Sequence, residues 1–176
     1  MTVYSIGHST RPLDEFLGLL RAHGVTHVVD TRTVPRSRRN PQYNREALPE
    51  ALRPAGIGYA HVPGLGGLRR PRRDSVNTAW RNAGFRGYAD HMQTPEFAES
   101  LETLIALAAR AQVAVMCAEA VPWRCHRSLI ADALTVRQVP VEHILDGGRH
   151  RHRLTPWARV DGVRLTYPAQ RVTPAG

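Results

Sequence analysis

Short apolar runs alternate with helical segments along most of the chain, and this alternation restricts the fold more than any other feature. Apolar runs typical of strands occupy residues 3–6, 25–32, 57–62, 113–119 and 141–146. Segments with helical periodicity or caps lie between them, at residues 12–23, 46–53, 95–108 and 125–138. This order predicts an α/β fold with an open, mostly parallel sheet and helices on both faces, in a Rossmann-like three-layer form.

Local signals support these assignments. An apolar stripe with i, i+3, i+4 and i+7 spacing begins at Leu13, and Gly24 predicts the end of that helix. Thr94 is a suitable N-cap for the helix that follows it. The run at 113–119 is almost continuously apolar, as is typical of a parallel strand covered on both faces. Pro49 fits its short helix only if it lies in the first turn.

We expect one α/β domain over residues 1–146. Residues 147–176 are rich in Arg, His and Pro and predict an extension that packs on this domain or trails from it. One extra strand is expected there, near residues 163–167. The segment 63–87 carries no clear periodicity and is expected to be a long loop, which in a small domain is usually functional or disordered.

The charge of the chain indicates an anionic partner. The formal net charge is +9, and every one of the 24 Lys or Arg residues is arginine. A cationic surface of this strength favours binding of phosphate-bearing ligands, including nucleic acid. A compositional bias explains the choice of arginine over lysine but does not by itself explain the surplus. The sequence gives no indication of a cofactor or of an oligomeric state.

No membrane association is expected, because no segment approaches the roughly 20 apolar residues that a transmembrane helix needs. The N-terminus lacks the basic start and the long apolar run of a signal peptide, so we expect a cytoplasmic protein. The two cysteines are expected to stay reduced there, and they are too few for a disulfide framework or a Cys₄ zinc site.

Polar and reactive side chains follow the predicted strands at the points where these strands end. Ligands of open α/β sheets bind beyond the carboxyl ends of the strands. We therefore expect an active site at this edge, and its candidate residues are His8, Ser9, Asp30, Arg32, Cys117 and Glu119.

Cys117 and Glu119 alternate on one predicted strand, so their side chains are expected to project to the same side. The carboxylate could act as a base or could order a water molecule or a substrate hydroxyl. The alternative is a buried core cysteine beside a solvent-facing glutamate, and Cys117 by itself favours that alternative. Glu119, at the end of an apolar strand, favours a function.

Cys125 lies at the predicted start of a helix, next to His126 and Arg127. Exposed helix-start N–H groups and nearby cations stabilise a thiolate, which predicts a nucleophile. The same groups could instead hold a phosphate without thiol chemistry, or could be a solvated helix cap. The spacing of Cys117, Glu119, Cys125 and His126 matches no established zinc pattern, so no metal site is expected.

The sequence leaves two alternative roles for His8 and two for the pair of Asp30 and Arg32. His8 could be a general acid or base, because its charge changes near neutrality, or it could bond to the backbone. Asp30 and Arg32 could belong to the active site, or could form a structural ion pair.

Two basic loops are candidates for substrate binding. The first, residues 32–45, contains Arg36. The second, residues 63–87, contains arginines interleaved with aromatic residues, which could neutralise phosphates and stack on bases. Its candidates are Arg69, Arg70, Trp80 and Arg86. Packing of the tryptophan against the sheet is the alternative.

Several motifs together resemble a bacterial and archaeal family called domain of unknown function 488. The similarity runs from Val3 to about Pro168 and implies an α/β fold, without an assigned activity. The matching motifs are residues 5–10, 30–37, 40–44 and 65–67, Met116-Cys117-Ala118-Glu119, and Cys125-His126-Arg127.

These observations predict an enzyme that hydrolyses or transfers a group of a nucleotide or nucleic acid. Cys125 or Glu119 is expected to perform the chemistry, and Arg32, Arg36 and Arg127 to hold the anion. One alternative is a non-catalytic nucleic-acid-binding module with structural thiols. Another is an enzyme of small-molecule thiol or sulfur transfer.

Overall fold

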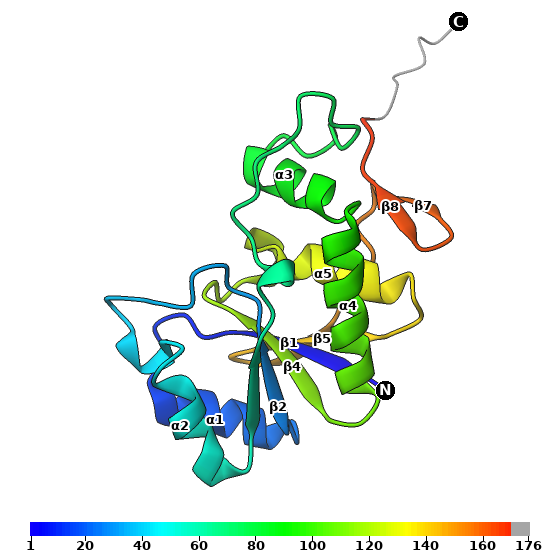
Figure 1. Cartoon of the computed structure of the whole chain (residues 1–176). Coiled ribbons are helices and arrows are strands. Elements are labelled where there is room, and N and C mark those ends of the chain that lie inside the picture. Colours follow the sequence, from blue (N-terminus) through cyan, green and yellow to red (C-terminus); the bar gives the residue numbers. More distant parts are fainter. Residues whose placement is uncertain (170–176) are drawn as a thin grey trace, which may run out of the picture.

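The computed structural model describes residues 1–169 and has a six-stranded sheet at its centre (Figure 1). The strand order is β3-β2-β4-β1-β5-β6, and all neighbours except the antiparallel pair β5 and β6 are parallel. The strands are β1 (Val3–Gly7), β2 (His27–Asp30), β3 (Gly58–His61), β4 (Val113–Cys117), β5 (Val141–Leu145) and β6 (Gly148–Arg151). The predicted α/β class with a mostly parallel sheet is confirmed.

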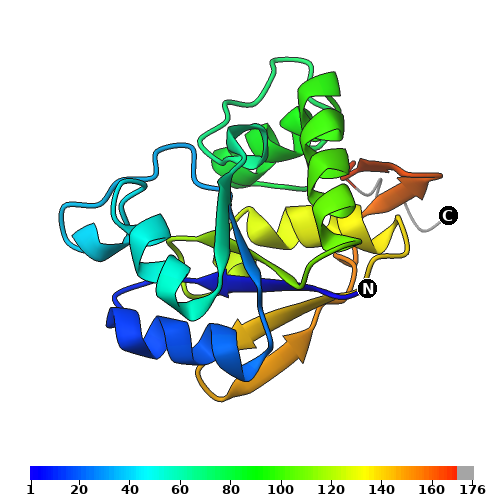
Figure 2. The same cartoon turned by 60° about the horizontal axis from the view of Figure 1, so that its bottom comes forward.

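Helices cover both faces of the sheet. Figure 2 shows α1 on one side of the sheet, with α4 and α5 on the other. The helices are α1 (Leu13–Ala22), α2 (Leu48–Leu52), α3 (Ala83–His91), α4 (Pro95–Ala108) and α5 (Arg127–Thr135). Within the described residues no helix is long and apolar enough to cross a membrane.

Alternate strand residues supply two separate cores, as the period of two in a strand requires. Val28 and Met116 pack with α1 and α2, whereas Val29 and Val115 pack with α3, α4 and α5. Each of these four valine and methionine side chains is at most 1% exposed. The central strands are therefore covered on both sides, which accounts for their continuous apolar sequence.

Several local predictions agree with the structure. Gly24, with φ of 66°, follows the last turn of α1, and Pro49 lies in the first turn of α2. The side chain of Thr94 accepts a hydrogen bond from Phe97 N and caps α4. The strand expected at 113–119 is shorter, because it ends at Cys117, and the helix expected from residue 125 begins at Arg127.

The segment 63–87 is an irregular loop over residues 66–82, as expected, but it has regular structure at both ends. It contains the 3-10 turn η3 (Pro63–Leu65) and the first half of α3. Asn82 caps α3 by accepting from Gly84 N and Phe85 N. Asp90 ties the loop to this helix, since it accepts from Arg72 N and from the Asn77 side chain. Two glycines among its nine residues, Gly84 and Gly87, make this helix hard to recognise in the sequence.

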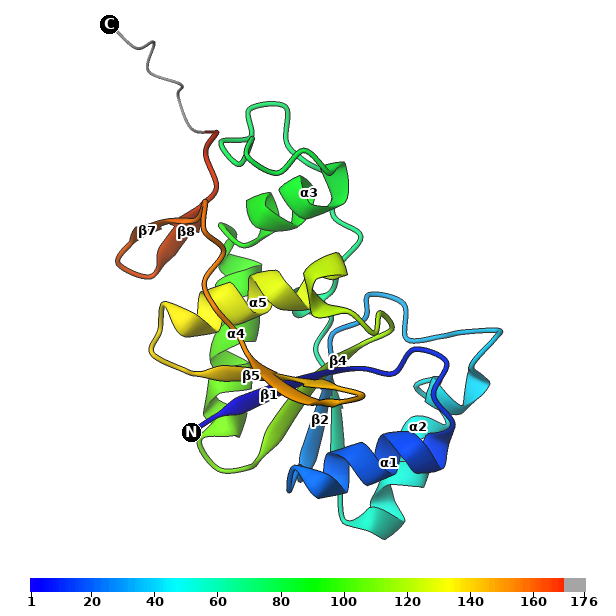
Figure 3. The ribbon, with the colours of Figure 1, turned by 180° about the vertical axis from the view of Figure 1, so that it is seen from behind.

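The segment expected as an extension adds structure of its own. Strand β6 pairs with β5 at the edge of the main sheet, and β7 (Arg159–Asp161) and β8 (Arg164–Thr166) form a separate hairpin (Figure 3). The strand expected near 163–167 corresponds to β8. Residues 170–176 of the extension lie outside the described residues. Three further 3-10 turns are η1 (Pro41–Tyr43), η2 (Arg53–Ala55) and η4 (Pro122–Arg124).

Candidate active site

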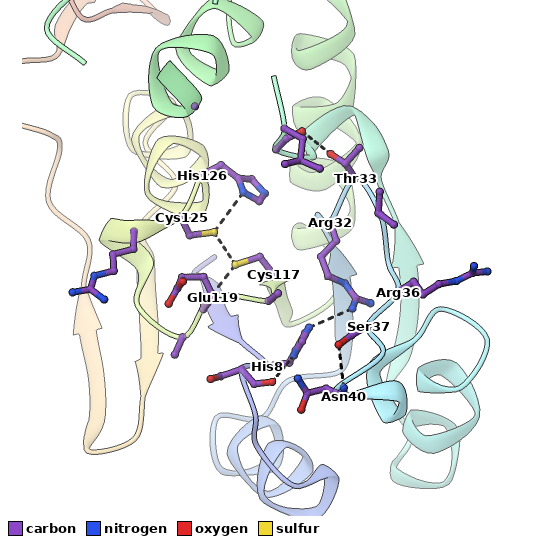
Figure 4. Close-up of a pocket in the computed structure, with 18 of the residues that line it drawn as sticks. His8, Arg32, Thr33, Arg36, Ser37, Asn40, Cys117, Glu119, Cys125 and His126 are labelled. Carbon is purple, nitrogen blue, oxygen red and sulfur yellow. Dashed lines mark hydrogen bonds between the residues drawn. The ribbon is translucent and has the colours of Figure 1, made fainter. Parts of the chain in front are cut away.

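A cavity of about 720 Å³ lies at the carboxyl ends of β1, β2 and β4. Three strand ends line it with His8, Arg32 and Cys117, and the turn before α5 adds Cys125 and His126. Figure 4 shows these side chains around the cavity, with the two thiols on one wall and Arg32 with His8 on another. Residues far apart in sequence meet there because parallel strands end at one edge of the sheet.

The sulfur of Cys125 has several polar groups around it. Its Sγ lies 2.7 Å from Cys117 Sγ and 3.4 Å from His126 Nδ1 (Figure 4). The backbone N–H of Arg127, at the start of α5, points at the same sulfur over 3.5 Å. Cys125 itself has an extended backbone just before that helix. Its sulfur is therefore surrounded by hydrogen-bond donors and lies at the positive end of a helix.

His126 is oriented by the backbone of the next strand end. Its Nε2 lies 3.0 Å from the carbonyl oxygen of Thr31, which can only accept a hydrogen bond. The proton of the neutral ring is therefore on Nε2, and the lone pair of Nδ1 faces Cys125. Burial lowers the pKa of His126 and so favours this neutral form. A thiol, a base and an orienting carbonyl thus lie in series, as in activated cysteine nucleophiles.

Arg127 is completely buried and contacts both thiols, Cys117 through its guanidinium and Cys125 through its backbone N–H. Its guanidinium donates to Cys117 Sγ over 2.9 Å, to Ser5 Oγ over 2.7 Å and to Glu119 O over 2.6 Å. Within residues 1–169 no carboxylate forms an ion pair with it. A buried cation without a direct anionic partner favours a negative charge on a neighbouring group, and the sulfur atoms are the nearest groups that can carry one.

Hydrogen bonding and burial shift the pKa values of the two thiols in opposite directions. The pKa of Cys125 is lowered to about 7, first by the hydrogen bond from the Cys117 thiol and then by Arg127, against the opposing effect of burial. The pKa of Cys117 is raised well above its ordinary value because that thiol is desolvated. The hydrogen bond from the Cys117 thiol therefore favours the negative charge on Cys125.

A chain of hydrogen bonds leads from Arg127 to a buried carboxylate. Ser5 Oγ accepts from Arg127 and donates to His143 Nδ1 over 2.8 Å. His143 Nε2 lies 2.9 Å from His152 Nδ1, and His152 Nε2 donates to Asp132 over 2.7 Å. All donors in this chain can point the same way, from the guanidinium to the carboxylate. The chain fixes the orientation of Arg127 and balances its charge at a distance.

His8 is held as a neutral ring. Its Nδ1 donates to Ser9 O over 2.8 Å, and its Nε2 accepts from Arg32 over 3.3 Å. Burial, with help from the nearby Arg32 and Arg127, lowers the pKa of His8 to about 4. The ring also stacks on Tyr43, with centroids 4.4 Å apart. Ser9, with φ of 47°, lines the same part of the cavity.

Asp30 and Arg32 form the structural ion pair that the sequence left open. The two groups lie 2.7 Å apart and are buried, and Tyr59 also donates to the carboxylate. Asp30 does not line the cavity, whereas Arg32 does. Arg32 donates to Tyr43 O as well, so its side chain is fixed in one wall of the site.

The carboxylate of Glu119 does not project beside the thiol of Cys117. The strand ends at Cys117, so the alternation of side chains does not extend to Glu119. Its side chain is exposed at the rim of the cavity and accepts from Val121 N over 3.4 Å. Its contribution inside the site is the backbone carbonyl, which accepts from Arg127 and lies 3.6 Å from Cys117 Sγ.

The basic residues divide into two groups. Arg36, Arg39 and Arg124 are exposed and line the cavity, and none of them forms an ion pair with the described residues. Four candidates of the second loop do not line the cavity, namely Arg69, Arg70, Trp80 and Arg86.

The contacts of that second loop are structural. Arg69 donates to the carbonyls of Gly66 and Pro63, and Arg86 donates to Trp80 O. Trp80 packs on Phe85, with ring centroids 5.0 Å apart, and on Trp157 and Tyr167. Trp80 therefore packs within the protein, which is the alternative to stacking on a base.

Several residues of the site carry no signal that singles them out in the sequence. Leu68 and Phe85 line the cavity, and Leu68 is 85% exposed with φ of 59°. Ser5, His143 and Asp132 hold Arg127 from outside the cavity. Sequence reasoning missed these three because their positions on β1, β5 and α5 resemble ordinary element interiors. Among the described residues no group of His, Cys, Asp and Glu could hold a metal ion.

Fold and site together define an α/β protein with a buried cysteine, histidine and arginine cluster at the carboxyl edge of its sheet. A family model described as "Domain of unknown function DUF488" matches residues 12–134, so the chain belongs to this family. The resemblance seen in the sequence is confirmed. Comparisons with curated proteins and with solved structures gave no match. His143 and His152 lie beyond the matched residues.

Proposed function

We propose that this protein is an enzyme in which Cys125 is the nucleophile and the substrate is an anion, a nucleotide or a nucleic acid. The reaction is a hydrolysis or a group transfer. The observation that carries the proposal is the setting of the Cys125 sulfur: donors from Cys117 and Arg127 surround it, and His126 Nδ1 lies 3.4 Å away.

The rim of the cavity supports the substrate class. Arg36, Arg39 and Arg124 present three cations around the opening, while Glu119 is the single acidic residue among the described residues that line it. Leu68 and Phe85 add an apolar and an aromatic surface to the same cavity. Phosphate oxygens suit the arginines and a base suits the apolar surface, which is the combination that a nucleotide offers.

The chemical step follows from these positions. The Cys125 thiolate attacks the electrophilic centre of the substrate, and the bond to the leaving group breaks with its electron pair. The leaving group takes up a proton from solvent water. The product is a thioester-like or thioether-like adduct on Cys125, according to the group transferred. In hydrolysis, water then attacks this adduct, His126 Nδ1 accepts its proton, and Cys125 leaves as the thiolate.

Incubation with pools of nucleotides and short single-stranded and duplex oligonucleotides tests the proposal. Product chromatography and intact-protein mass spectrometry are the measurements. We expect turnover, or a mass adduct that peptide mapping locates at Cys125, with wild type and neither with Cys125→Ala. Glu119→Gln is the matched control and should keep most of the activity, because that carboxylate lies at the exposed rim. Turnover that survives in Cys125→Ala would overturn the role of the thiol.

A second candidate is a non-catalytic nucleic-acid-binding module. The exposed arginines of the loop after β2 favour it, because they have no acidic partner among residues 1–169. The same experiment separates the two functions. Equal, salt-dependent binding by wild type and Cys125→Ala, with no product from either, would support the binding module and contradict the enzyme.

A further inference from the structure

Cys117 is a buried nucleophile that the proposed group transfer uses only as a hydrogen-bond donor. Its Sγ lies 2.7 Å from Cys125 Sγ, and these are the two cysteines of the chain. A disulfide bond is about 2.05 Å long, so the two sulfur atoms are about 0.7 Å farther apart than bonded sulfur atoms. The two sulfur atoms are therefore direct neighbours and are placed for bonding to each other.

The contacts of the pair also set an order of reaction. Cys125 faces the cavity beside His126, and its sulfur has the Arg127 N–H and the Cys117 thiol as donors. Cys117 lies deeper, and its Sγ accepts from the Arg127 guanidinium over 2.9 Å. A thiolate at the wall of a cavity, with a protonated thiol directly behind it, is the arrangement in which the first sulfur attacks and the second resolves the adduct.

We propose that Cys117 is a resolving thiol and that the pair reduces anionic low-molecular-weight disulfides, itself becoming a Cys117–Cys125 disulfide. The inference rests on the reactive Cys125 of the proposed function and adds a two-electron reaction to it.

The reaction takes place in two exchanges. The Cys125 thiolate attacks one sulfur of the disulfide RSSR, which forms Cys125–S–S–R and releases RS⁻. Cys117 then attacks the Cys125 sulfur of this adduct, the Cys125–SR bond breaks, and R leaves as RSH with the Cys117 proton. In sum the two protein thiols are oxidised to one disulfide and RSSR is reduced to two thiols. Arg127 stabilises the negative charge that develops on Cys117 during the second exchange.

The rim of the cavity selects for negative charge on this substrate. Arg36, Arg39 and Arg124 surround the opening, and Arg32 contributes to the wall inside. A disulfide that carries carboxylates is attracted by these cations, whereas a cationic disulfide is repelled. Charge on the small disulfide should therefore change the rate of the first exchange.

The test uses glutathione disulfide as the anionic probe and cystamine as the cationic one. Reduced wild type is mixed with each probe near neutral pH, quenched with acid over time, and analysed by intact-mass and peptide mass spectrometry after alkylation of free thiols. We expect a transient glutathione adduct on Cys125 and then the Cys117–Cys125 disulfide, with two thiols released per chain. Glutathione disulfide should react about tenfold faster than cystamine at low salt.

Two variants locate the roles. Cys117→Ser should stop at a stable adduct on Cys125 with one thiol released, and Cys117→Ala should repeat this result if the serine variant folds poorly. Cys125→Ser should leave Cys117 unmodified. A stable adduct on wild-type Cys125, with Cys117 free, would overturn the resolving role. A reaction with cystamine that is as fast as that with glutathione disulfide, or faster, would overturn the preference for anionic disulfides.

Alkylation of wild type with iodoacetamide at pH about 7 distinguishes the two proposals. Labelling of Cys125 without any reaction with glutathione disulfide would contradict the disulfide reaction and leave the group transfer standing. No labelling of Cys125 under native conditions would contradict both, because each requires the accessible thiolate.

Discussion

Arg127 is the residue on which the chemistry of the site depends. A completely buried guanidinium is costly unless its donors are all occupied and its charge is balanced. Here its donors reach a sulfur, a hydroxyl and two backbone carbonyls, while the formal counter-charge, Asp132, is reached only through Ser5, His143 and His152. The imbalance is local, and a negative charge in the adjoining thiol pair relieves it.

The pH dependence of thiol labelling tests this account. Cys125 should react with iodoacetamide much faster than Cys117, with a midpoint near pH 7, because the pKa of Cys125 is lowered to about 7. In Cys117→Ala the midpoint should move to higher pH, since the largest stabilising hydrogen bond is lost. Peptide mass spectrometry at a series of pH values gives both rates. Equal, slow labelling of the two thiols in the folded protein would reduce Cys125 to a structural residue, and labelling in denaturant is the control.

Single residues were predicted unevenly from the sequence. The cluster of Cys117, Cys125 and His126 followed from their places after a strand and before a helix. Glu119 was misplaced because the point where a strand ends depends on its neighbours, which a single sequence does not reveal. For Asp30 and Arg32 both alternatives are consistent with the pattern, and the buried contact of the two groups, with Tyr59 on the carboxylate, distinguishes them.

At the scale of elements, the two basic loops have different roles. The loop after β2 carries Arg36, Arg38 and Arg39, which are exposed at or near the cavity. In the loop after η3, Arg69 is committed to backbone carbonyls and Arg72 to Asp74. The first loop is therefore the better candidate for contact with an anionic polymer.

Salt dependence of binding tests the first loop. Replacing Arg36, Arg38 and Arg39 by Gln should flatten the slope of log K against log salt for a single-stranded oligonucleotide by up to about 2 units, because each lost phosphate contact contributes about 0.7. Fluorescence anisotropy over a range of salt concentrations measures the slope. The matched control replaces Arg21, Arg53 and Arg110, which lie on segments that lead to the opposite edge of the sheet. Equal flattening in both variants would mean that only net charge matters.

Local signals in the sequence identify some elements, whereas α3 is missed although Asn82 caps it. The apolar stripe of α1 and the Thr94 cap of α4 identify these helices in the sequence. Helix α3 is missed because contacts from elsewhere hold it: Gly87 packs so closely on the backbone of Arg69 that a Cβ would lie 2.1 Å from its carbonyl oxygen. Strand β6, with exposed residues throughout, is defined by its pairing with β5.

At the scale of the whole molecule, the C-terminal part of the chain is connected to the site. His152 follows β6, and Tyr167 follows β8 and donates to Asp132 over 2.8 Å. The hydrogen-bonded chain therefore joins β1, β5, α5 and the C-terminal segment beneath the thiols. Because its histidines are buried, the same connection makes the folded molecule sensitive to acid.

Two buried histidines predict how stability changes with pH. Burial is the main cause that lowers the pKa of His8 to about 4 and that of His143 to about 3, whereas both have ordinary values near 6.5 in the unfolded chain. Between these limits the unfolded state binds more protons than the folded state. The free energy of unfolding should therefore fall as the pH drops below about 6.5, by about 2 kcal/mol for each histidine between pH 7 and 5.

Urea unfolding followed by circular dichroism at pH 7 and pH 5 measures this loss directly. In His8→Asn the loss should shrink by the share of one histidine, even if the variant is less stable at both pH values, because the residue that takes up the proton on unfolding is gone. His150→Asn is the matched control: this side chain is exposed on β6, so its replacement should leave the difference between the two pH values nearly unchanged. A free energy of unfolding that is the same at pH 7 and pH 5 in wild type would show that His8 and His143 accept protons in the folded state. In that case the neutral, buried setting of His8 beside Arg32 would be wrong.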